Sequence, residues 1–596
     1  MCGIAGVFGR ADPATVTRML DTLRHRGPDD GHVVSGDQFT LGVRRLSIVD
    51  VEGGRQPLTN EDGTVVAAQN GEIYNFPELR PALLKAGHHL LTHTDTEVLP
   101  HLWEEYGDRL PEHIQGMFAV AVWDSRQRVG LLARDRMGKK PLYYWEHDGA
   151  LYFASELKAL LVVPGFTRRL NHEALHHYLS YKHVPHPLTI FEGVRMLAPA
   201  HRLVFRPGTR PVTSRYWSLS FASRNGRVPD EREVVDELLS RLRTAVRRRL
   251  MSDVPIGFFL SGGIDSSLTT ALAAEIAPDR IKTFTLTYDD GATTSGKEQD
   301  RRWAGWVAER YGTDHCEERI SVSNYPEQLR AILRSFDEPF AGVVSTYFLA
   351  QRMARHVKVA VAGDGADELF GSYLSHRVAA GAETLADTAG TADWEWRARL
   401  LVLSEEEKRS LYAPGLRETV GGASTPHHLR QAFDTLTARD PLNRMLEAEF
   451  HGIFPDQVLA FVDRLSMAHS LEVRSAFLDT DVVEYVASLP GALKIHDGET
   501  KHVLKEAARR YFPEEMVRRP KEGFLMPVAN WVRGDLQPWV RETLSADRLG
   551  MHGLFDAARV DALIDAVYRP GADYRDVNKV LSLAIFQEWY ELYLAS

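Results

Sequence analysis

The stretch PIGFFLSGGIDSSLTTALAAEIA, residues 255–277, has three parts in a fixed order. PIGFFL (255–260) is a short apolar strand pattern that ends in a glycine-rich turn, and LTTALAAEIA (268–277) has the composition of a helix. The glycines let the backbone approach an anion, and a helix N-terminus favours negative charge. Ser261, Ser266 and Ser267 add hydroxyl donors, and Asp265 is a suitable magnesium ligand. The stretch predicts a phosphate site, although a glycine-rich helix entry without function is the alternative.

Strand and helix patterns alternate on both sides of this stretch. Strand patterns occur at 281–288 and 357–363, and helical patterns at 234–251 and 302–312. Such alternation is typical of a doubly wound parallel sheet. From about residue 380 the pattern is mainly helical. We therefore predict an α/β doubly wound domain with a largely helical C-terminal part over residues 234–596.

The first 205 residues have a different pattern, with strands that outnumber helices. Apolar strand patterns lie at 65–69, 117–123 and 129–135, and helical patterns at 76–87 and 96–107. This arrangement predicts an α+β layered domain over residues 1–205. Residues 206–233 are rich in Pro, Ser, Arg and Gly, and we interpret them as the linker.

Charge and cysteine content exclude several classes of protein. The net charge is -10, with 71 basic and 81 acidic residues, which gives no electrostatic footprint for a nucleic-acid partner. There are two cysteines, Cys2 and Cys316, so we expect a reducing, cytoplasmic location rather than a disulfide framework. The start resembles no signal peptide, and no apolar stretch approaches the roughly 20 residues of a membrane helix.

Cys2 is a candidate nucleophile. Removal of Met1 would place it at the amino terminus, where the α-amino group, with a pKa of about 7.7, can take the thiol proton. The alternative is a cysteine that stands second by chance in an apolar strand.

Nearby residues suit the binding of glutamine. Arg45 suits the α-carboxylate, Asp95 suits the α-ammonium, and Asn70 with the backbone of Gly71 suits an oxyanion. Each has an ordinary alternative. Arg45 could form a surface ion pair, Asp95 a helix cap, and Asn70–Gly71 a hairpin turn.

Five ordered motifs make the resemblance explicit. CGI at the start, RHRGPDD (24–30), RLSIVD (45–50), NGEIYN (70–75) and ARDRMGKKPLYY (133–144) resemble the class II glutamine amidotransferase family. The resemblance implies an N-terminal-nucleophile sandwich of two sheets between helices (αββα). It also implies Cys2 as nucleophile and Asn70 and Gly71 as the oxyanion hole. The glutamine-binding residues that it implies are Arg45, Leu46, Ser47, Ile48, Val49, Asn70, Gly71, Glu72 and Asp95.

The second half resembles another family. LSGGIDSS (260–267) is similar to the pyrophosphate loop of ATP pyrophosphatases, and AGDGADELFGSY (362–373), DRLSMAHSLEVRSAFLD (463–479) and RPKEGF (519–524) resemble the asparagine synthetase C-terminal domain. The ATP-binding residues so implied are Leu260, Ser261, Gly262, Gly263, Asp265, Ser266, Ser267, Leu286, Ala362 and Gly363. The resemblance also implies Asp265 and Asp367 as magnesium ligands, Asp364 as an acid linked to the adenylate, and Lys521 as a stabiliser of phosphate charge.

Several positions depart from the family pattern. Ala362 stands where the family often has Ser, and Asp364 where it often has Glu. SAFLD (475–479) replaces VPFLD, and Ser345 stands where a proline is common. The segment 293–302 is more polar than expected. These departures concern the carboxylate acceptor more than the ATP chemistry.

The resemblance implies glutamine-dependent, ATP-consuming amidation of aspartate to asparagine through an acyl adenylate. Magnesium would be the cofactor, and glutamate, AMP and pyrophosphate would be the other products. Another carboxylic acid of specialised metabolism is the alternative acceptor. A degenerate scaffold without activity would predict damage at the catalytic positions, which are all present. Relatives are often dimers, so a homodimer is expected by resemblance alone.

Overall fold

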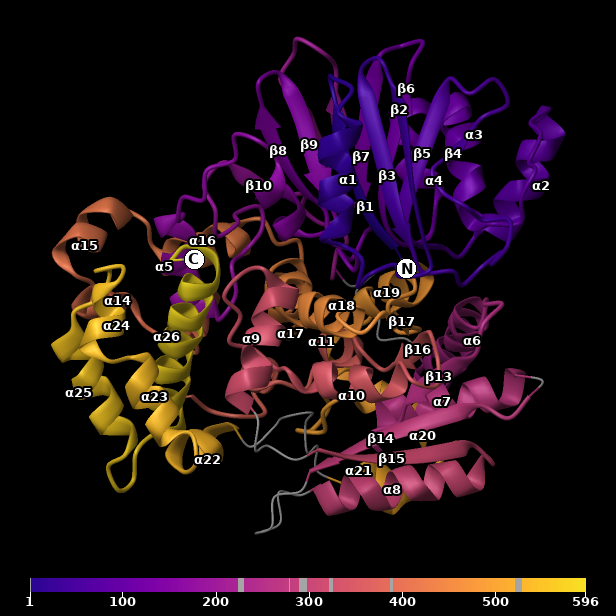
Figure 1. The fold of residues 1–596 in the computed structure, drawn as a ribbon. Coiled ribbons are helices and arrows are strands. Elements are labelled where there is room, and N and C mark those ends of the chain that lie inside the picture. Colours follow the sequence, from indigo (N-terminus) through magenta and orange to yellow (C-terminus); the bar gives the residue numbers. More distant parts are fainter. Residues whose placement is uncertain are drawn as a thin grey trace.

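The computed structural model describes residues 2–222, 230–277, 279–288, 297–320, 325–385, 390–519 and 528–595. Two antiparallel sheets form the upper part of the molecule in Figure 1, and one parallel sheet with most of the helices forms the lower part. No helix of the described residues is long and apolar enough to cross a membrane.

Two six-stranded antiparallel sheets make up the first domain. One sheet has the order β10-β8-β9-β1-β3-β2 and the other β12-β11-β7-β6-β5-β4. The strands of the first sheet are β1 (Cys2–Phe8), β2 (Asp30–Gly36), β3 (Phe39–Arg45), β8 (Tyr143–His147), β9 (Ala150–Ala154) and β10 (Val194–Met196). Those of the second are β4 (Leu58–Thr59), β5 (Val65–Ile73), β6 (Gly116–Asp124), β7 (Val129–Arg134), β11 (His201–Phe205) and β12 (Val212–Arg215).

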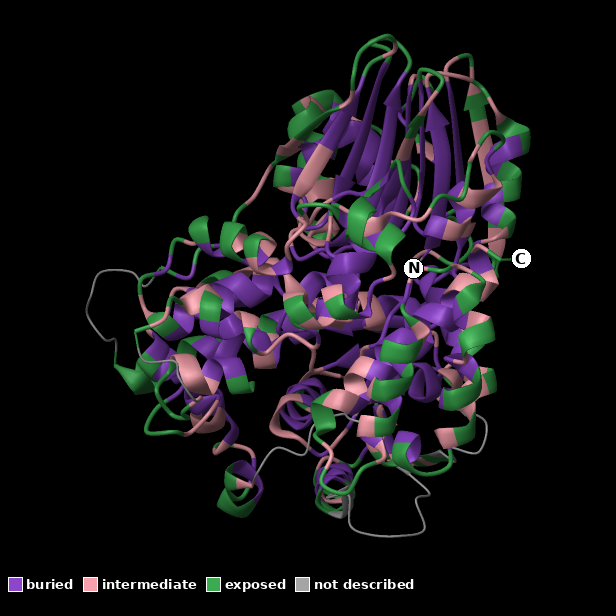
Figure 2. Ribbon diagram, turned by 90° about the vertical axis from the view of Figure 1, so that its left-hand side faces the viewer, coloured by how far each residue is buried: buried purple, intermediate pink, exposed green. Residues whose placement is uncertain are grey.

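The alternation of side chains explains why the two sheets stack. On β6, Ala121 and Trp123 face the first sheet, whereas Val120 and Val122 face α3 (Val98–Tyr106) on the outer side. Both faces are buried, so the strand has a continuous apolar sequence instead of alternating polar and apolar residues. Helix α1 (Pro13–Asp21) covers the first sheet, and Figure 2 shows the buried strands between partly exposed helices. The predicted αββα sandwich is confirmed.

The third sheet is parallel, with the order β15-β14-β13-β16-β17. Its strands are β13 (Ile256–Phe259), β14 (Lys282–Tyr288), β15 (Asp314–Ile320), β16 (Val359–Ala362) and β17 (Glu472–Ser475). Phe258 and Val361 pack with α6 (Glu231–Arg249) and α7 (Ile264–Ile276) on one face, while Ala360 packs with α10 (Ser345–Met353) on the other. Helices on both faces confirm the predicted doubly wound α/β domain.

The chain beyond the third sheet is helical, as expected. It ends in α25 (Ala557–Val567) and α26 (Tyr574–Tyr593), and α26 lies beside α5 (His172–Tyr181) of the first domain (Figure 1). The Tyr178 hydroxyl donates to the Ser582 carbonyl at 2.8 Å. The last helix therefore fastens the two halves of the chain to each other.

The connection between the halves is shorter than the predicted linker, residues 206–233. Strand β12, with the polar sequence VTSR, pairs with β11 at the sheet edge, and α6 begins at Glu231. An edge strand without an apolar run gives no strand pattern in the sequence, which is why it was assigned to the linker.

Candidate active sites

Cys2 is the first residue of β1, directly opposite Arg45 on β3. Its backbone nitrogen donates to Asn70 Oδ1 at 3.2 Å, and its side chain is buried. Burial raises the pKa of the Cys2 thiol, while the backbone of Leu46 and the charge of Arg45 lower it in part. The pairing of β1 with β3 and the stacking of the two sheets thus bring the predicted nucleophile, Arg45 and Asn70 together.

Asn70 and Gly71 lie on β5, in the second sheet. The Asn70 Nδ2 group is buried and has no hydrogen-bond partner among the described residues. Gly71 has φ of +138°, and a Cβ there would lie 1.9 Å from the Met117 carbonyl oxygen. Only glycine fits this position, where β5 passes close to β6. The adjacent Asn70 thus offers a free amide donor beside Cys2.

Asp95 is held in place by neutral donors. Gln69 Nε2 and the Ile73 backbone nitrogen each donate to Asp95 Oδ2 at 2.7 Å, and Thr94 Oγ1 donates to Oδ1 at 3.2 Å. Burial raises the pKa of Asp95, and these hydrogen bonds lower it in part. A cationic group is the partner that this buried carboxyl lacks in the described structure, which suits the α-ammonium of an amino acid.

Two glutamines in this network escaped the sequence analysis. Gln56 Oε1 accepts from the Gln69 backbone nitrogen at 2.8 Å, and Gln56 Nε2 lies 4.0 Å from Cys2 Sγ. Gln69 stands one residue before the NGE triplet, and Gln56 belongs to no motif. The position of Gln69 was a usable signal, whereas Gln56 reaches the site only through the fold.

The RLSIV segment has two uses. The Arg45 guanidinium donates to the carbonyls of Val49, Asp50 and Val51 at 2.6 to 3.0 Å, which fixes its direction. The side chains of Leu46 and Ile48 pack with Val359 and Met467 of the second domain, and their predicted contact with glutamine stays a prediction. The Leu46 backbone reaches the Cys2 thiol, and the Ser47 nitrogen donates to Asp29 Oδ2 at 2.8 Å.

The loop between β13 and α7 forms the second candidate site. Ser261 and Ser266 are linked through their hydroxyls at 3.0 Å, and the Gly263 nitrogen donates to Ser261 Oγ at 3.3 Å. Gly262 has φ of +77°, and a Cβ there would lie 2.1 Å from the Asp300 carbonyl oxygen. The Ser267 Oγ atom is buried without a partner in the described part of the chain. This closed turn at a helix N-terminus fits a phosphate group.

The end of β16 meets this loop. A Cβ at Gly363 would lie 3.0 Å from the Asp265 Cβ atom and 3.1 Å from the Ser266 nitrogen. Ala362 pairs with Ser475 on β17, and the Ser475 hydroxyl donates to the Asp364 carbonyl at 2.6 Å. The predicted residues Leu260 and Leu286 are buried nearby on adjacent strands. The loop 260–267 and the turn 362–365 therefore share one edge of the parallel sheet.

Lys501 bridges the two predicted magnesium ligands, and the sequence analysis missed it. Its Nζ atom lies 2.6 Å from Asp265 Oδ2 and 2.7 Å from Asp367 Oδ1. These carboxylates raise the pKa of Lys501 although burial opposes the shift. The Asp265 Oδ1 atom is buried without a hydrogen-bond partner among the described residues. A pair of carboxylates that already holds a cation and keeps a spare oxygen fits a hard divalent ion.

Lys139 enters this region from the first domain. It follows β7 in the ARDRMGKKPLYY motif, is buried, and its Nζ atom has no hydrogen-bond partner within the described ranges. Burial lowers the pKa of Lys139 to about 7, with a smaller opposing effect from Asp364. Burial raises the pKa of Asp364 to about 6, and Lys139 counteracts the shift. Lys521 lies outside the described residues, as do most of RPKEGF and residues 293–296 of the polar segment 293–302.

Buried ion pairs join the two domains between the candidate sites. Arg474 of β17 lies 3.4 Å from Glu72 Oε1 and donates to Glu472 Oε1 at 2.6 Å. Arg26 of the RHRGPDD motif lies 2.9 Å from Asp463 Oδ2. All of these side chains are buried. The domain contact is therefore a sealed, charged layer, which we call the interdomain layer: Arg26, Glu72, Lys140, Glu156, Asp463, Glu472 and Arg474.

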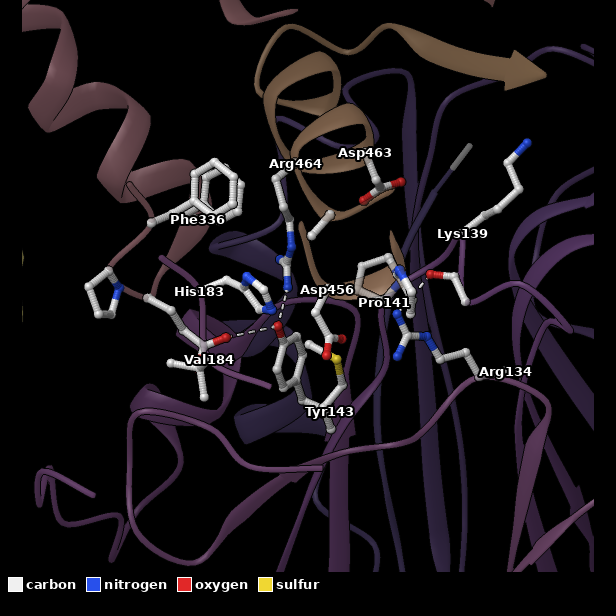
Figure 3. Close-up of a pocket in the computed structure, with 17 residues that line it drawn as sticks. Arg134, Lys139, Pro141, Tyr143, His183, Val184, Phe336, Asp456, Asp463 and Arg464 are labelled. Atoms are coloured by element: carbon white, nitrogen blue, oxygen red, sulfur yellow. Dashed lines mark hydrogen bonds between the residues drawn. The ribbon is translucent and has the colours of Figure 1, made fainter. Parts of the chain in front are cut away.

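A cavity of about 30 Å³ adjoins this layer. Figure 3 shows Tyr143, Arg464, His183 and Lys139 around it. Arg464 donates to the Tyr143 hydroxyl at 2.7 Å, and that hydroxyl donates to Glu338 at 3.3 Å. The volume suits one or two small polar molecules.

The chain is similar to known proteins along its whole length. The family model Glutamine amidotransferase domain matches residues 1–217, and the model Asparagine synthase matches residues 237–591. The glutamine-hydrolyzing asparagine synthetases 1 and 3 of Bacillus subtilis are each 31% identical, over 99% and 100% of this chain and 97% and 99% of their own lengths. Amidase chry2 of Gibberella zeae is 27% identical over 92% of this chain and 90% of its own.

Proposed function

Because the chain belongs to the asparagine synthase family and carries a glutamine amidotransferase domain, we propose that it makes asparagine from aspartate, glutamine and ATP. Two candidate sites in one chain, joined by a buried contact, are the observation that supports this proposal. One site suits release of ammonia from an amide, and the other suits activation of a carboxylate.

Glutamine hydrolysis would use Cys2 after removal of Met1. The α-amino group takes the thiol proton, and Sγ attacks the side-chain amide carbon of glutamine. The Asn70 Nδ2 donor and the Gly71 backbone stabilise the negative oxygen. The C–N bond breaks, the proton goes to the leaving nitrogen, and ammonia departs. Water then cleaves the thioester to give glutamate.

Glutamine would be oriented by its two charged ends. The fixed guanidinium of Arg45 suits the α-carboxylate, and Asp95 suits the α-ammonium. Both groups are held by neighbours before any substrate binds. Such preorganisation lowers the cost of placing the amide carbon against Sγ.

Carboxylate activation would take place at the edge of the parallel sheet. An aspartate carboxylate oxygen attacks the α-phosphorus of ATP, and pyrophosphate leaves into the loop 260–267. Ammonia then attacks the acyl carbon, and AMP leaves. When bound, magnesium neutralises phosphate charge, and Asp265 and Asp367 would hold it.

Two further residues would support this second step. In the proposed scheme Asp364 would lie beside the adenylate, and a carboxyl with a pKa of about 6 can accept the proton that ammonia loses. We also propose that Lys521 stabilises phosphate charge, on the resemblance alone.

Ammonia would cross the interdomain layer without entering solvent. The full burial of Glu72, Arg474 and Asp463 supports an internal passage, and the cavity beside Arg464 offers a polar resting place. With glutamine saturating, labelled ammonia added outside should stay out of the product. Free entry of the label would contradict internal transfer.

The acceptor is the point on which a second candidate deserves a test. Ser345 and Ser475 depart from the family pattern, and the similarity to a fungal amidase supports another carboxylic acid as acceptor. Ser475 also bonds the Asp364 backbone, so a departure touches the site itself.

The deciding experiment is pyrophosphate release by purified protein with ATP, magnesium, glutamine and aspartate, and then without aspartate. Release that depends on aspartate, with asparagine as product, supports the first proposal. Glutamine hydrolysis without aspartate-dependent pyrophosphate would overturn aspartate as the acceptor. Other carboxylic acids would then be screened, with AMP release as the readout.

A further inference from the structure

A cluster of two histidines and two glutamates lies on the outer side of the first domain. It joins the turn between β4 and β5 (Glu61), the segment after α2 (Phe76–Ala86; His88), and one face of α3 (His101 and Glu104). These elements lie at the edge of the upper domain in Figure 1, away from the parallel sheet. One ligand atom from each residue lies within 4.8 Å of every other.

His101 cannot be explained as an ordinary buried histidine. Its side chain is 1% exposed, and both ring nitrogens have no hydrogen-bond partner in the part of the chain that is described. Its Nδ1 atom points toward Glu61 Oε1 at 3.5 Å and Glu104 Oε2 at 3.8 Å, which is too long for hydrogen bonds. A buried imidazole without partners is costly unless the site is completed by another group.

The distances match a tetrahedral metal site. Bonds of roughly 2.0–2.1 Å from a zinc ion place neighbouring ligand atoms roughly 3.3–3.4 Å apart. The four histidine–glutamate separations are 3.5 and 3.7 Å from His88 Nδ1, and 3.5 and 3.8 Å from His101 Nδ1. A shift of a few tenths of an ångström would close the shell.

Neighbouring residues orient the ligands. His88 Nε2 lies 3.1 Å from Glu105 Oε1, so a proton on Nε2 leaves the Nδ1 lone pair for a metal. Asn60 Nδ2 donates to Glu104 Oε1 at 2.9 Å, and the His89 nitrogen donates to Glu61 Oε1 at 2.8 Å. Carboxylates behind a histidine and donors behind a carboxylate are the usual supports of a metal site.

A second cluster, Glu231, His502 and Glu506, lacks this character. Its histidine already meets Glu499 at 3.0 Å and Glu231 at 2.9 Å, one through each ring nitrogen. Hydrogen bonds explain that cluster fully, and they do not explain the one around His101.

We propose that Glu61, His88, His101 and Glu104 bind a structural zinc ion. Two imidazoles and two carboxylates suit zinc in its preferred geometry. The ion ties the β4–β5 turn and α3 to the segment 88–94, which leads directly into Asp95. The site would therefore brace the glutamine pocket from outside, and it does not depend on the identity of the acceptor.

The test uses the full chain in a Cys2→Ala background, which removes the thiol of the predicted nucleophile as a competing ligand. Protein is equilibrated with zinc, dialysed, and its metal content is measured. We expect about one zinc per chain in this background and in a His89→Gln control, which alters the exposed neighbouring histidine. His88→Gln and Glu104→Gln should each lower the retained zinc at least several-fold.

Cobalt substitution provides a second readout, which separates loss of the bound metal from loss of the fold. Bound Co²⁺ should give the visible absorption of a tetrahedral site, and His88→Gln should abolish it while the far-ultraviolet dichroism stays unchanged. Equal zinc content in His88→Gln and His89→Gln, or no retained zinc in the parent protein, would overturn the proposal.

Discussion

The proposed glutamine site and the proposed ATP site differ in what holds their charged residues. Asp95, at the start of the short helix η1 (Asp95–Glu97), is fixed by amide and backbone donors of the antiparallel strand β5 and by the hydroxyl of Thr94. Asp265 and Asp367, at the edge of the parallel sheet, are fixed by the charge of Lys501. The first site thus holds a carboxylate whose charge is free to meet a cationic substrate group. In the second site, an incoming cation would have to replace the ammonium group of Lys501.

The difference also concerns where the residues come from. Cys2 and Arg45 lie on paired strands of the first sheet, and the stacking of the second sheet brings Asn70 of β5 against Cys2. The ATP site needs the loop 260–267, the turn 362–367 and Lys501, which come from three distant segments. Separate construction predicts that each site can be damaged without harm to the other.

Cys2→Ala gives the largest expected effect and tests this separation directly. Loss of the nucleophile should lower glutamine-dependent synthesis by roughly 10⁴-fold or more. Synthesis from added ammonia should stay within about twofold of the parent, because the Cys2 side chain packs in the core between the two sheets of the first domain. Parallel loss of both activities would show that the sites are not independent. Product formation with glutamine and product formation with ammonium salts measure the two activities.

Asp265→Ala breaks the comparison from the other side. Removal of a carboxylate that Lys501 contacts should lower pyrophosphate release by roughly 10³-fold. Hydrolysis of glutamine, followed as glutamate, should continue. A matched control is Asp279→Ala, a change beyond the end of α7 on the same domain, which should alter neither activity.

Asn70→Ala sharpens the account of the first site. Loss of one oxyanion donor should lower glutaminase kcat by roughly 10²-fold, with a smaller change in KM. Ammonia-dependent synthesis again serves as the internal control. A change confined to KM would instead make Asn70 a binding residue.

The smallest effect concerns the interdomain layer and pH. Burial raises the pKa of Asp463, but Arg26 and Lys140 outweigh it and lower the pKa to about 2. A carboxyl with a depressed pKa stabilises the fold at pH values above its pKa in the unfolded chain, which is near 4. That contribution is lost as the pH falls toward 2. Asp463 alone should contribute about 2 kcal/mol across this window. Urea unfolding at pH 5 and pH 3 should show about half of this loss, roughly 1 kcal/mol, and the pH dependence should flatten in Asp463→Asn.

Much of the fold could be predicted because both patterns are local. The run GMFAVAVW on β6 is apolar on both faces, and PIGFFL, which contains β13, leads directly into a glycine-rich turn. Strand β12 was missed because an edge strand needs no apolar residues. The motifs likewise named Cys2, Arg45 and Asn70, which the structure brings together, while the roles of these residues and of Asp95 stay predictions.

The rest depended on contacts between distant parts of the chain. Leu46 and Ile48 belong to a glutamine-binding motif, yet their side chains serve the domain contact. Lys501 sits at the start of α20 (His502–Ala508) with φ of +57°, in a sequence that matches no motif. Gln56 and Lys139 reach the two sites through the packing of sheets and domains. No pattern along the chain encodes such encounters.

At the proposed magnesium site, Lys501 would make the carboxylate pair behave as an ion exchanger. A metal arriving at Asp265 and Asp367 would have to displace an ammonium group that is already in contact with both, so the net gain would be one unit of charge instead of two. Free magnesium would gain little from this exchange. A nucleotide that offers the displaced ammonium its own phosphate oxygens would remove the penalty, so metal and nucleotide would favour each other's binding. The internal counter-ion would therefore couple the two ligands without any movement of the surrounding sheet.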